Sequence, residues 1–350
     1  MLTNVRALTE RQGRSLETAR TQSIAVSVSG LLQLLWLAWA CRQSGISLKL
    51  RRPRLTPEVK RLLKLIWPAA AGAGAVQINL VISTALAASL LAHGSVTYIY
   101  MADRLNQLPL GLIGIGLGTV LLPTISRQLG GGEEAAAMDT QNRGMELALL
   151  LTLPATVALV VCGEPIAAGL FGYGRFTATD VHHTAEALAA FSIGLPSYIL
   201  VKVLTPGFYA RHDTKTPVRF AVISMLVNLV GNLALIVPLQ HMGPPLATAV
   251  ASTVNVGLLF HTLRQRGHFT ADDRLKRRAP RLALAALAMG AVLWAVQDRL
   301  LPYLHGTWLV RFIALGLLVS AGALVYGVAT FVLGAFTRDD LQFLRRKRAR

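Results

Sequence analysis

The sequence is poor in charged residues and in cysteine. Only 15% of its 350 residues are charged, whereas 53% are hydrophobic. Soluble domains carry about 25% charged residues, so this composition excludes an ordinary soluble fold. The two cysteines, Cys41 and Cys162, form no C-x-x-C pair and are predicted at the ends of apolar segments on opposite sides of a bilayer. They cannot share a disulfide or a zinc ion, and we expect both to be small apolar fillers.

Catalytic and nucleotide-binding motifs are also missing from the sequence. It contains no P-loop, no His–Ser–Asp set and no paired carboxylates within an apolar segment. We therefore predict that the protein is not an enzyme, needs no cofactor and is not driven by nucleotide hydrolysis. His182 and His183 are neighbours in a predicted external loop, with no third ligand nearby. We interpret them as solvated residues and predict no metal site.

Long apolar segments are what the sequence has in abundance. A helix needs about 20 apolar residues to cross about 30 Å of hydrocarbon. The segments here are continuous and rich in Leu, Ala, Val and Gly, without the ten-residue alternation of an outer-membrane barrel. We predict an all-α polytopic membrane protein with nine transmembrane helices. The nine segments are residues 23–41, 65–92, 95–122, 147–163, 187–201, 218–238, 244–263, 282–297 and 312–336.

The formal net charge of +18 is distributed by topology. The loop 42–64 holds eight Lys or Arg residues, the loop 264–281 holds seven, and the chain ends in RRKRAR, whereas the intervening short loops 93–97 and 239–243 hold none. The predicted external loop 164–186 holds one, Arg175, and the predicted loop 202–217 holds three, Lys202, Arg211 and Lys215. This alternation follows the positive-inside rule and predicts a cytoplasmic C-terminus with basic loops against anionic membrane lipids. Because no basic run is interleaved with aromatic residues, we predict no nucleic-acid partner.

Two adjacent charges interrupt the segment 95–122. Asp103 and Arg104 lie about nine residues into it, roughly 13 Å deep, where a charge costs at least about 2.5–3.5 kcal/mol. One interpretation is a neutralising pair, in which Arg104 also reaches Gln107 or a helix carbonyl. We favour an arginine that faces a wet cavity and binds an anion, because its planar fork suits bidentate contact with phosphate. The head group of a lipid carrier is the natural phosphate at that depth.

Uncharged polar residues form a second set within the apolar segments. Asn228 and Asn232 are four residues apart and share one face of the segment 218–238. We favour interhelical hydrogen bonds for this set, and two alternatives stay open: lining of a hydrated cavity, or coordination of a small cation. The candidates are Gln77, Asn79, Ser83, Asn228 and Asn232.

The stretch YMADRLNQLPLGLIGIGLGTVLLPTISRQL, residues 100–129, resembles the MurJ/MviN family of bacterial lipid II flippases. Three further blocks are similar to the same family. They are GLFGYGRFT at 169–177, VKVLTPGFYARHDTKTPVR at 201–219 and IWPAAAGAGAVQINLVIST at 66–84. Together the resemblance covers about residues 24–340.

The resemblance implies two pseudo-symmetric lobes of six helices, as in multidrug/oligosaccharidyl-lipid/polysaccharide exporters, followed by two more helices. The nine predicted spans resemble the last nine of these fourteen, so the chain is expected to lack the five N-terminal helices. The expected parts are a polar leader unlike the family (1–22), the last N-lobe helix and a basic cytoplasmic loop (23–64), the C-lobe of six helices (65–266), a basic cytoplasmic linker (267–281), two additional helices (282–336) and a basic cytoplasmic tail (337–350).

The function that the resemblance implies is translocation of lipid II, the undecaprenyl-pyrophosphate-linked peptidoglycan precursor, to the periplasmic leaflet of the bacterial inner membrane by alternating access. Arg104, with Asp103 beside it, matches an A-D-R-L motif whose arginine engages the pyrophosphate in relatives. The resemblance places the family's other cavity arginines in the first two helices, which this chain is expected to lack. Expected partners are lipid II, anionic membrane lipids and other cell-wall synthesis proteins. The alternatives are an ion-coupled exporter of drugs or another lipid-linked glycan on the same fold, and an inactive C-terminal fragment that binds only lipid or a partner.

Overall fold

The computed structural model describes residues 2–45, 81–92, 94–300 and 308–335, together with the single positions 57, 60, 77 and 303. All regular secondary structure in these ranges is helical, which confirms the predicted all-α class. The chain divides into two compact units, Met1–Pro68 and Ala69–Arg350. Each unit is described by itself.

The first unit is represented by one helix, α1 (Leu2–Gln43). Its apolar part, Ser23–Gln43, is long enough to cross a membrane and contains the predicted span 23–41. Large apolar side chains on it are exposed, among them Trp36, whose ring lies 5.2 Å from that of Trp39. Exposed apolar surface of this kind suits a helix that faces lipid or another helix.

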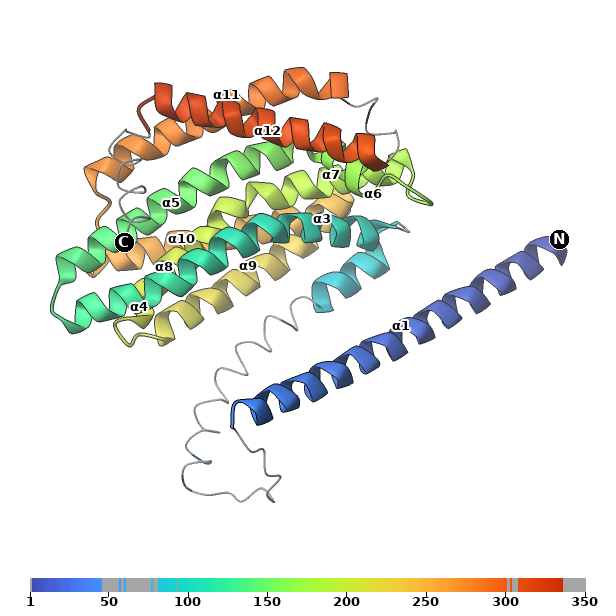
Figure 1. Ribbon diagram of the computed structural model, residues 1–350, viewed down its shortest axis with the longest axis horizontal. Coiled ribbons are helices and arrows are strands. Elements are labelled where there is room, and N and C mark those ends of the chain that lie inside the picture. The colour runs from blue at the N-terminus through green and yellow to red at the C-terminus, as the bar shows by residue number, and fades with distance from the viewer. Residues whose placement is uncertain are drawn as a thin grey trace. The chain divides into compact units, whose positions relative to one another are not determined.

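The second unit is a bundle of antiparallel helices (Figure 1). A short apolar helix, Val81–Leu90, precedes it in the chain. Of the seven described segments that are apolar and long enough to span a membrane, six belong to this unit, and one of them, 215–265, contains both α9 and α10. The helices of the bundle are α3 (Ser95–Pro109), η1 (Leu110–Ile115), α4 (Gly116–Gly130), α5 (Glu134–Val161), α6 (Gly163–Phe171), α7 (Ala178–Ile193), α8 (Leu195–Tyr209), α9 (Lys215–Leu239), η2 (Gln240–Met242), α10 (Gly243–Gln265), α11 (Asp273–Leu300) and α12 (Trp308–Val332).

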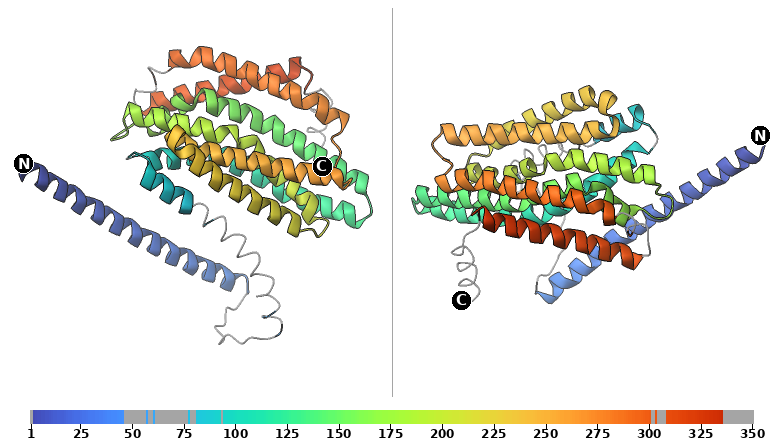
Figure 2. Two further views of the ribbon diagram at one scale, coloured as in Figure 1. Left: turned by 180° about the vertical axis from the view of Figure 1, so that it is seen from behind. Right: turned by 90° about the horizontal axis from the view of Figure 1, so that it is seen from above.

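Eight of the nine predicted spans correspond to helices in these described ranges. Most of the remaining one, 65–92, lies outside the described residues, as do most of the predicted loop 42–64 and the tail 337–350. The helices α9 and α10 lie side by side, α11 lies along α5, and α12 lies along α11 (Figure 2). The turns 131–133, 210–214 and 266–272 gather at one end of the bundle, which we call the basic end because it carries Arg211 and Arg266.

The predicted external loop 164–186 is wrong in its extent. It contains α6 and the first half of α7, because Thr177 and Asp180 form a capping box that starts α7 at Ala178. The Asp180 carboxylate accepts from the Thr177 backbone N–H at 2.7 Å, and the Thr177 hydroxyl accepts from the Asp180 N–H at 3.3 Å. Likewise, α8 continues to Tyr209, so Lys202 lies within a helix and not in the predicted loop 202–217.

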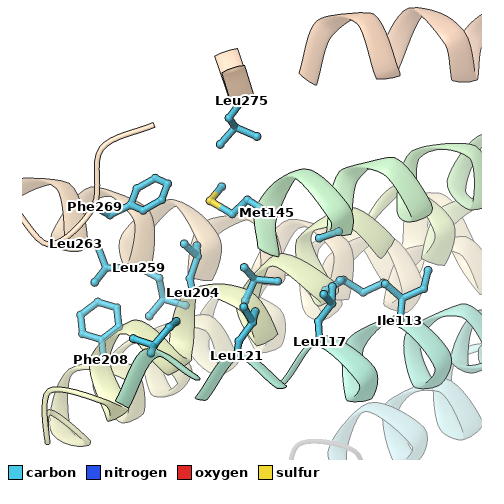
Figure 3. Packing of buried hydrophobic residues seen from close by; sticks show 14 of the residues in the cluster. Ile113, Leu117, Leu121, Met145, Leu204, Phe208, Leu259, Leu263, Phe269 and Leu275 are labelled. Carbon is cyan, nitrogen blue, oxygen red and sulfur yellow. The ribbon is translucent and has the colours of Figure 1, made fainter. Parts of the chain in front are cut away.

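The principal core lies between α4, α5, α8 and α10 (Figure 3). Leu121 of α4 and Leu204 of α8 are buried there with the ring of Phe208. A Cβ atom added at Gly144 of α5 would lie 2.9 Å from the Leu121 side chain, so the glycine permits this close approach of α4 and α5. Small residues that let helix backbones approach are a usual basis of packing between membrane helices.

Ionic contacts tie the helices together at the basic end. Asp213, in the turn after α8, accepts from Arg266 Nη1 at 2.6 Å and from the Thr216 backbone N–H at 3.0 Å. Burial alone would raise the pKa of the Asp213 carboxyl, but the hydrogen bonds from Thr216 and Arg266 outweigh it and hold that pKa at about 2. The turn between α8 and α9 is therefore fastened to the end of α10.

Candidate functional site

Arg104 lies on the exposed face of α3. The opposite face of this helix buries Ala102 and Leu105 against α7, in a cluster with Leu188. Arg104 and the side chain one turn further, Gln107, are both exposed. Within a membrane span, a charged side chain in this position requires water or a polar partner.

Gln107 links the two charged side chains of α3. Its amide oxygen accepts from Arg104 Nη1 at 3.2 Å, while its amide nitrogen donates to Asp103 Oδ2. The guanidinium carbon of Arg104 also lies 4.7 Å from the centre of the Tyr100 ring, a distance typical of a cation–π contact. The structure thus brings Asp103, Arg104 and Gln107 together, and Tyr100 is a neighbour that sequence reasoning missed. Tyr100 stands four residues before Arg104, a helical spacing that signals such a contact.

The helix changes its winding directly after these residues. Pro109 ends α3, and Leu110–Ile115 form the π-helical turn η1 before α4 begins. Proline lacks the backbone N–H that an α-helix uses, and single π-turns occur frequently at functional sites. A Cβ atom at Gly114 would lie 3.6 Å from Cγ of Lys202, so this turn packs closely on α8.

A hollow of about 320 Å³, lined by both polar and apolar side chains, opens between η1, α8, α9 and α10. Lys202 belongs to its wall, and its position four residues after Tyr198 puts both on one face of α8. Sequence reasoning counted Lys202 among loop residues. The apolar residues on both sides of it, in YILVKVLTPGF, were the signal that it lies inside a helix. The polar residues around the hollow are Tyr198, Lys202, Ser224, Asn228, Thr248, Ser252 and Asn255.

Three of the predicted polar candidates form one chain of hydrogen bonds. The Asn232 amide donates to the Ser83 hydroxyl and to Asn228 Oδ1, each at 3.0 Å, and the Asn228 amide donates to the Thr248 hydroxyl at 3.0 Å. These bonds join the helix Val81–Leu90, α9 and α10. Gln77 is an exposed helical residue, and Asn79 lies outside the described residues. A role of this set in binding an ion stays a prediction.

The two neighbouring histidines differ from their prediction. They lie in α7 and not in a loop, and the expectation that no third ligand is nearby is wrong. His183 Nδ1 lies 3.1 Å from Glu186 Oε2, and the same oxygen lies 2.8 Å from Nε2 of His241. His241 is 55 residues away from Glu186 in the sequence, so only the fold brings them together.

An apolar groove of about 330 Å³ lies between α5, α11 and α12. Pro154 of α5, Met289 of α11 and Leu318 of α12 contribute to its wall, and Tyr326 closes one part by donating to the Leu150 carbonyl at 2.9 Å. Its lining is suited to a hydrocarbon chain.

Comparison with known proteins identifies relatives over most of the chain. The family described as "Lipid II flippase MurJ" matches residues 10–318, so the match begins within the predicted leader 1–22. A protein of Rhizobium tropici named "Probable lipid II flippase MurJ" is 41% identical over 333 residues, which are 95% of this chain and 62% of that protein. A protein of the same name from Rhizobium meliloti (strain 1021) is 43% identical over 93% of this chain and 60% of its own length.

A solved structure described as "Lipid II flippase MurJ, inward closed conformation" is also similar. It covers 81% of this chain and 56% of its own, with a TM-score of 0.64 and 26% sequence identity. The chain therefore spans about 60% of the length of the two curated relatives, at 62% and 60%.

Proposed function

The chain belongs to the MurJ family of lipid II flippases, and from this premise we propose that it takes part in translocating lipid II from the cytoplasmic to the periplasmic leaflet of the bacterial inner membrane. The proposal includes alternating access, in which the head group enters a cationic cavity that opens first inside and then outside. The basic end of the bundle is the cytoplasmic end in this proposal, in keeping with the positive-inside rule.

The observation that carries the proposal is the exposed Arg104 on a membrane-spanning helix. Its guanidinium is oriented by Gln107 and by the ring of Tyr100, and it has a fork that fits the oxygens of a pyrophosphate. Lys202 supplies a second cation beside the π-helical turn that follows. An anionic head group inserted among these side chains would offset the cost of holding their charges at bilayer depth.

The apolar groove is the proposed site for the lipid tail. In the proposal the undecaprenyl chain stays in contact with lipid along α11 and α12, where the groove lies. Transport needs no nucleotide site on this chain, because a membrane potential supplies about 2.3 kcal/mol per charge per 100 mV.

Substitution of Arg104 tests the proposal. In a full-length flippase that carries this chain as its C-terminal part, we expect Arg104→Ala to abolish lipid II translocation and Arg104→Lys to restore little of it, because ammonium lacks the bidentate fork. Arg127→Ala is the matched control, since Arg127 is an exposed arginine at the end of α4. Translocation is measured at equal membrane abundance. Wild-type rates for Arg104→Ala would refute the assignment of Arg104 to the head group.

A further inference from the structure

We propose that His183, Glu186 and His241 form a binding site for a divalent transition-metal ion, with Zn²⁺ as the best match. The site lies at the end of the bundle opposite the basic end, where α7 begins, and it does not depend on the proposed transport function. One ligand atom from each residue lies within 4.8 Å of the other two. Two imidazole nitrogens and one carboxylate oxygen are a donor set that Zn²⁺ commonly accepts, with a fourth position left for water.

The distances between the donor atoms are close to those around a bound ion. With metal–ligand bonds of about 2.0–2.2 Å, two ligands of a tetrahedral Zn²⁺ ion are about 3.3–3.6 Å apart. Glu186 Oε2 already lies 3.1 Å from His183 Nδ1 and 2.8 Å from His241 Nε2. Each of these two distances has to increase by less than 1 Å for the ion to fit between the atoms. Side-chain rotation is sufficient for a change of this size.

The local backbone directs these three side chains toward one another. His183 and Glu186 are three residues apart on α7 and therefore share a face. His241 follows Gln240, a non-glycine residue with φ 47° and ψ −124°. The His241 side chain is buried. Such a backbone conformation costs energy and persists where the surrounding structure enforces it, often at functional positions.

The helix α3 contacts both histidines through the ring of Tyr98. The Tyr98 ring of α3 lies 5.4 Å from the His183 ring and 6.2 Å from the His241 ring, and its hydroxyl donates to Asp180 at 2.6 Å. Asp180 in turn caps α7. Groups that fix the orientation of metal ligands are a regular part of metal sites. A bound ion would cross-link α7 to the turn between α9 and α10.

His182 lies at the rim of this cluster. Its Nε2 is 3.6 Å from Glu186 Oε1, and its Nδ1 is 3.6 Å from Glu164 Oε2. We assign it no ligand role, because the Glu186 oxygen that it approaches is not the one shared by His183 and His241. The competing interpretation of the cluster is a carboxylate that two imidazoles share through hydrogen bonds alone.

Titration with Zn²⁺ separates the two interpretations. Residues 1–350, purified in detergent and stripped with EDTA, are expected to bind one Zn²⁺ ion per chain in calorimetry. His183→Gln and His241→Gln should each weaken Zn²⁺ binding by at least about 10-fold. Substitution of a residue that only orients a metal ligand already lowers metal affinity by about 10-fold or more, and a lost ligand should cost no less. His261→Gln, an exposed histidine of α10, is the matched control and should bind as the wild type does.

Two further readouts keep the test decisive if a variant folds poorly. Melting in EDTA should be the same for the wild type and for a folded variant. Zn²⁺ should raise the melting temperature of the wild type and of His261→Gln, but not that of His183→Gln or His241→Gln. In the wild-type chain, Co²⁺ should give the visible absorption bands of a four-coordinate ion with nitrogen and oxygen ligands. Absence of stoichiometric Zn²⁺ binding and of these Co²⁺ bands, or binding that neither His→Gln variant changes, would overturn the proposal.

Discussion

At the scale of single residues, Arg104 is held by short-range contacts on its own helix. Gln107 joins Arg104 to Asp103, and Tyr100 covers the guanidinium from the preceding turn. Adjacent residues diverge by about 100° around a helix, so Asp103 is poorly placed to neutralise Arg104 directly. Gln107 lies one turn away, and its amide accepts from Arg104 and donates to Asp103, so it connects the two charged side chains.

Substitutions at Asp103 test this arrangement. Asp103→Asn keeps an oxygen that accepts from Gln107, so we expect a smaller loss of lipid II translocation than for Arg104→Ala. Asp103→Leu removes the acceptor and releases Gln107, so the loss should be larger, with folded protein retained because the Asp103 side chain is only partly buried. Translocation is measured per folded protein, with abundance from gel filtration. Equal losses for Asn and Leu would contradict a role of Gln107 in positioning.

At the scale of elements, α5 and α11 are joined by charge as well as by apolar packing. Glu146 of α5 is buried and accepts from Arg278 Nη1 of α11. Two further arginines contact the other carboxylate oxygen: Arg274 Nε lies at 3.1 Å and Arg143 Nη1 at 3.0 Å. A carboxylate that several guanidiniums share fixes the register of two helices, and its removal leaves like charges close together.

We expect Glu146→Gln to lower the free energy of unfolding by about 3–5 kcal/mol, the range measured when one partner of a buried pair is removed. Asp273→Asn is the matched control on α11, since the Asp273 side chain is 81% exposed and its ion pair with Lys276, at 3.3 Å, is a surface i,i+3 pair. That change should stay within about 0.5 kcal/mol. Unfolding is followed by circular dichroism in detergent. An equal effect of both substitutions would show that the Glu146 cluster adds no stability.

At the scale of the whole molecule, the chain covers 62% and 60% of two curated relatives. In the two-lobed arrangement that the sequence resemblance implies, the translocation cavity lies between the lobes. A pyrophosphate carries about two negative charges, and one guanidinium leaves much of the cost of its desolvation uncompensated. In the proposed function Lys202 would reduce this deficit within the second unit, but the resemblance places the family's further cavity arginines in the other lobe.

We therefore expect residues 1–350, expressed by themselves, not to restore growth when a bacterium is depleted of its lipid II flippase. Co-expression of the remaining N-terminal part of the Rhizobium tropici relative should restore it. The Arg104→Ala chain serves as the control in the same co-expression, and it should fail although it reaches the membrane. Growth supported by residues 1–350 alone would contradict the need for a second set of cationic residues.

The sequence by itself determined the all-α membrane class and the approximate position of eight spans, because hydrophobicity along a helix is a local property. It also singled out Arg104, since a charge at bilayer depth is anomalous whatever surrounds it. Only the tertiary structure decided which polar groups meet: Asn232 with Ser83 across 149 residues, Glu146 with Arg278 across 132, and Glu186 with His241 across 55. Such pairs depend on which helix faces pack together and on where each helix begins. The capping box of Thr177 and Asp180 starts α7 at Ala178, and His183 therefore lies in this helix and not in the predicted loop.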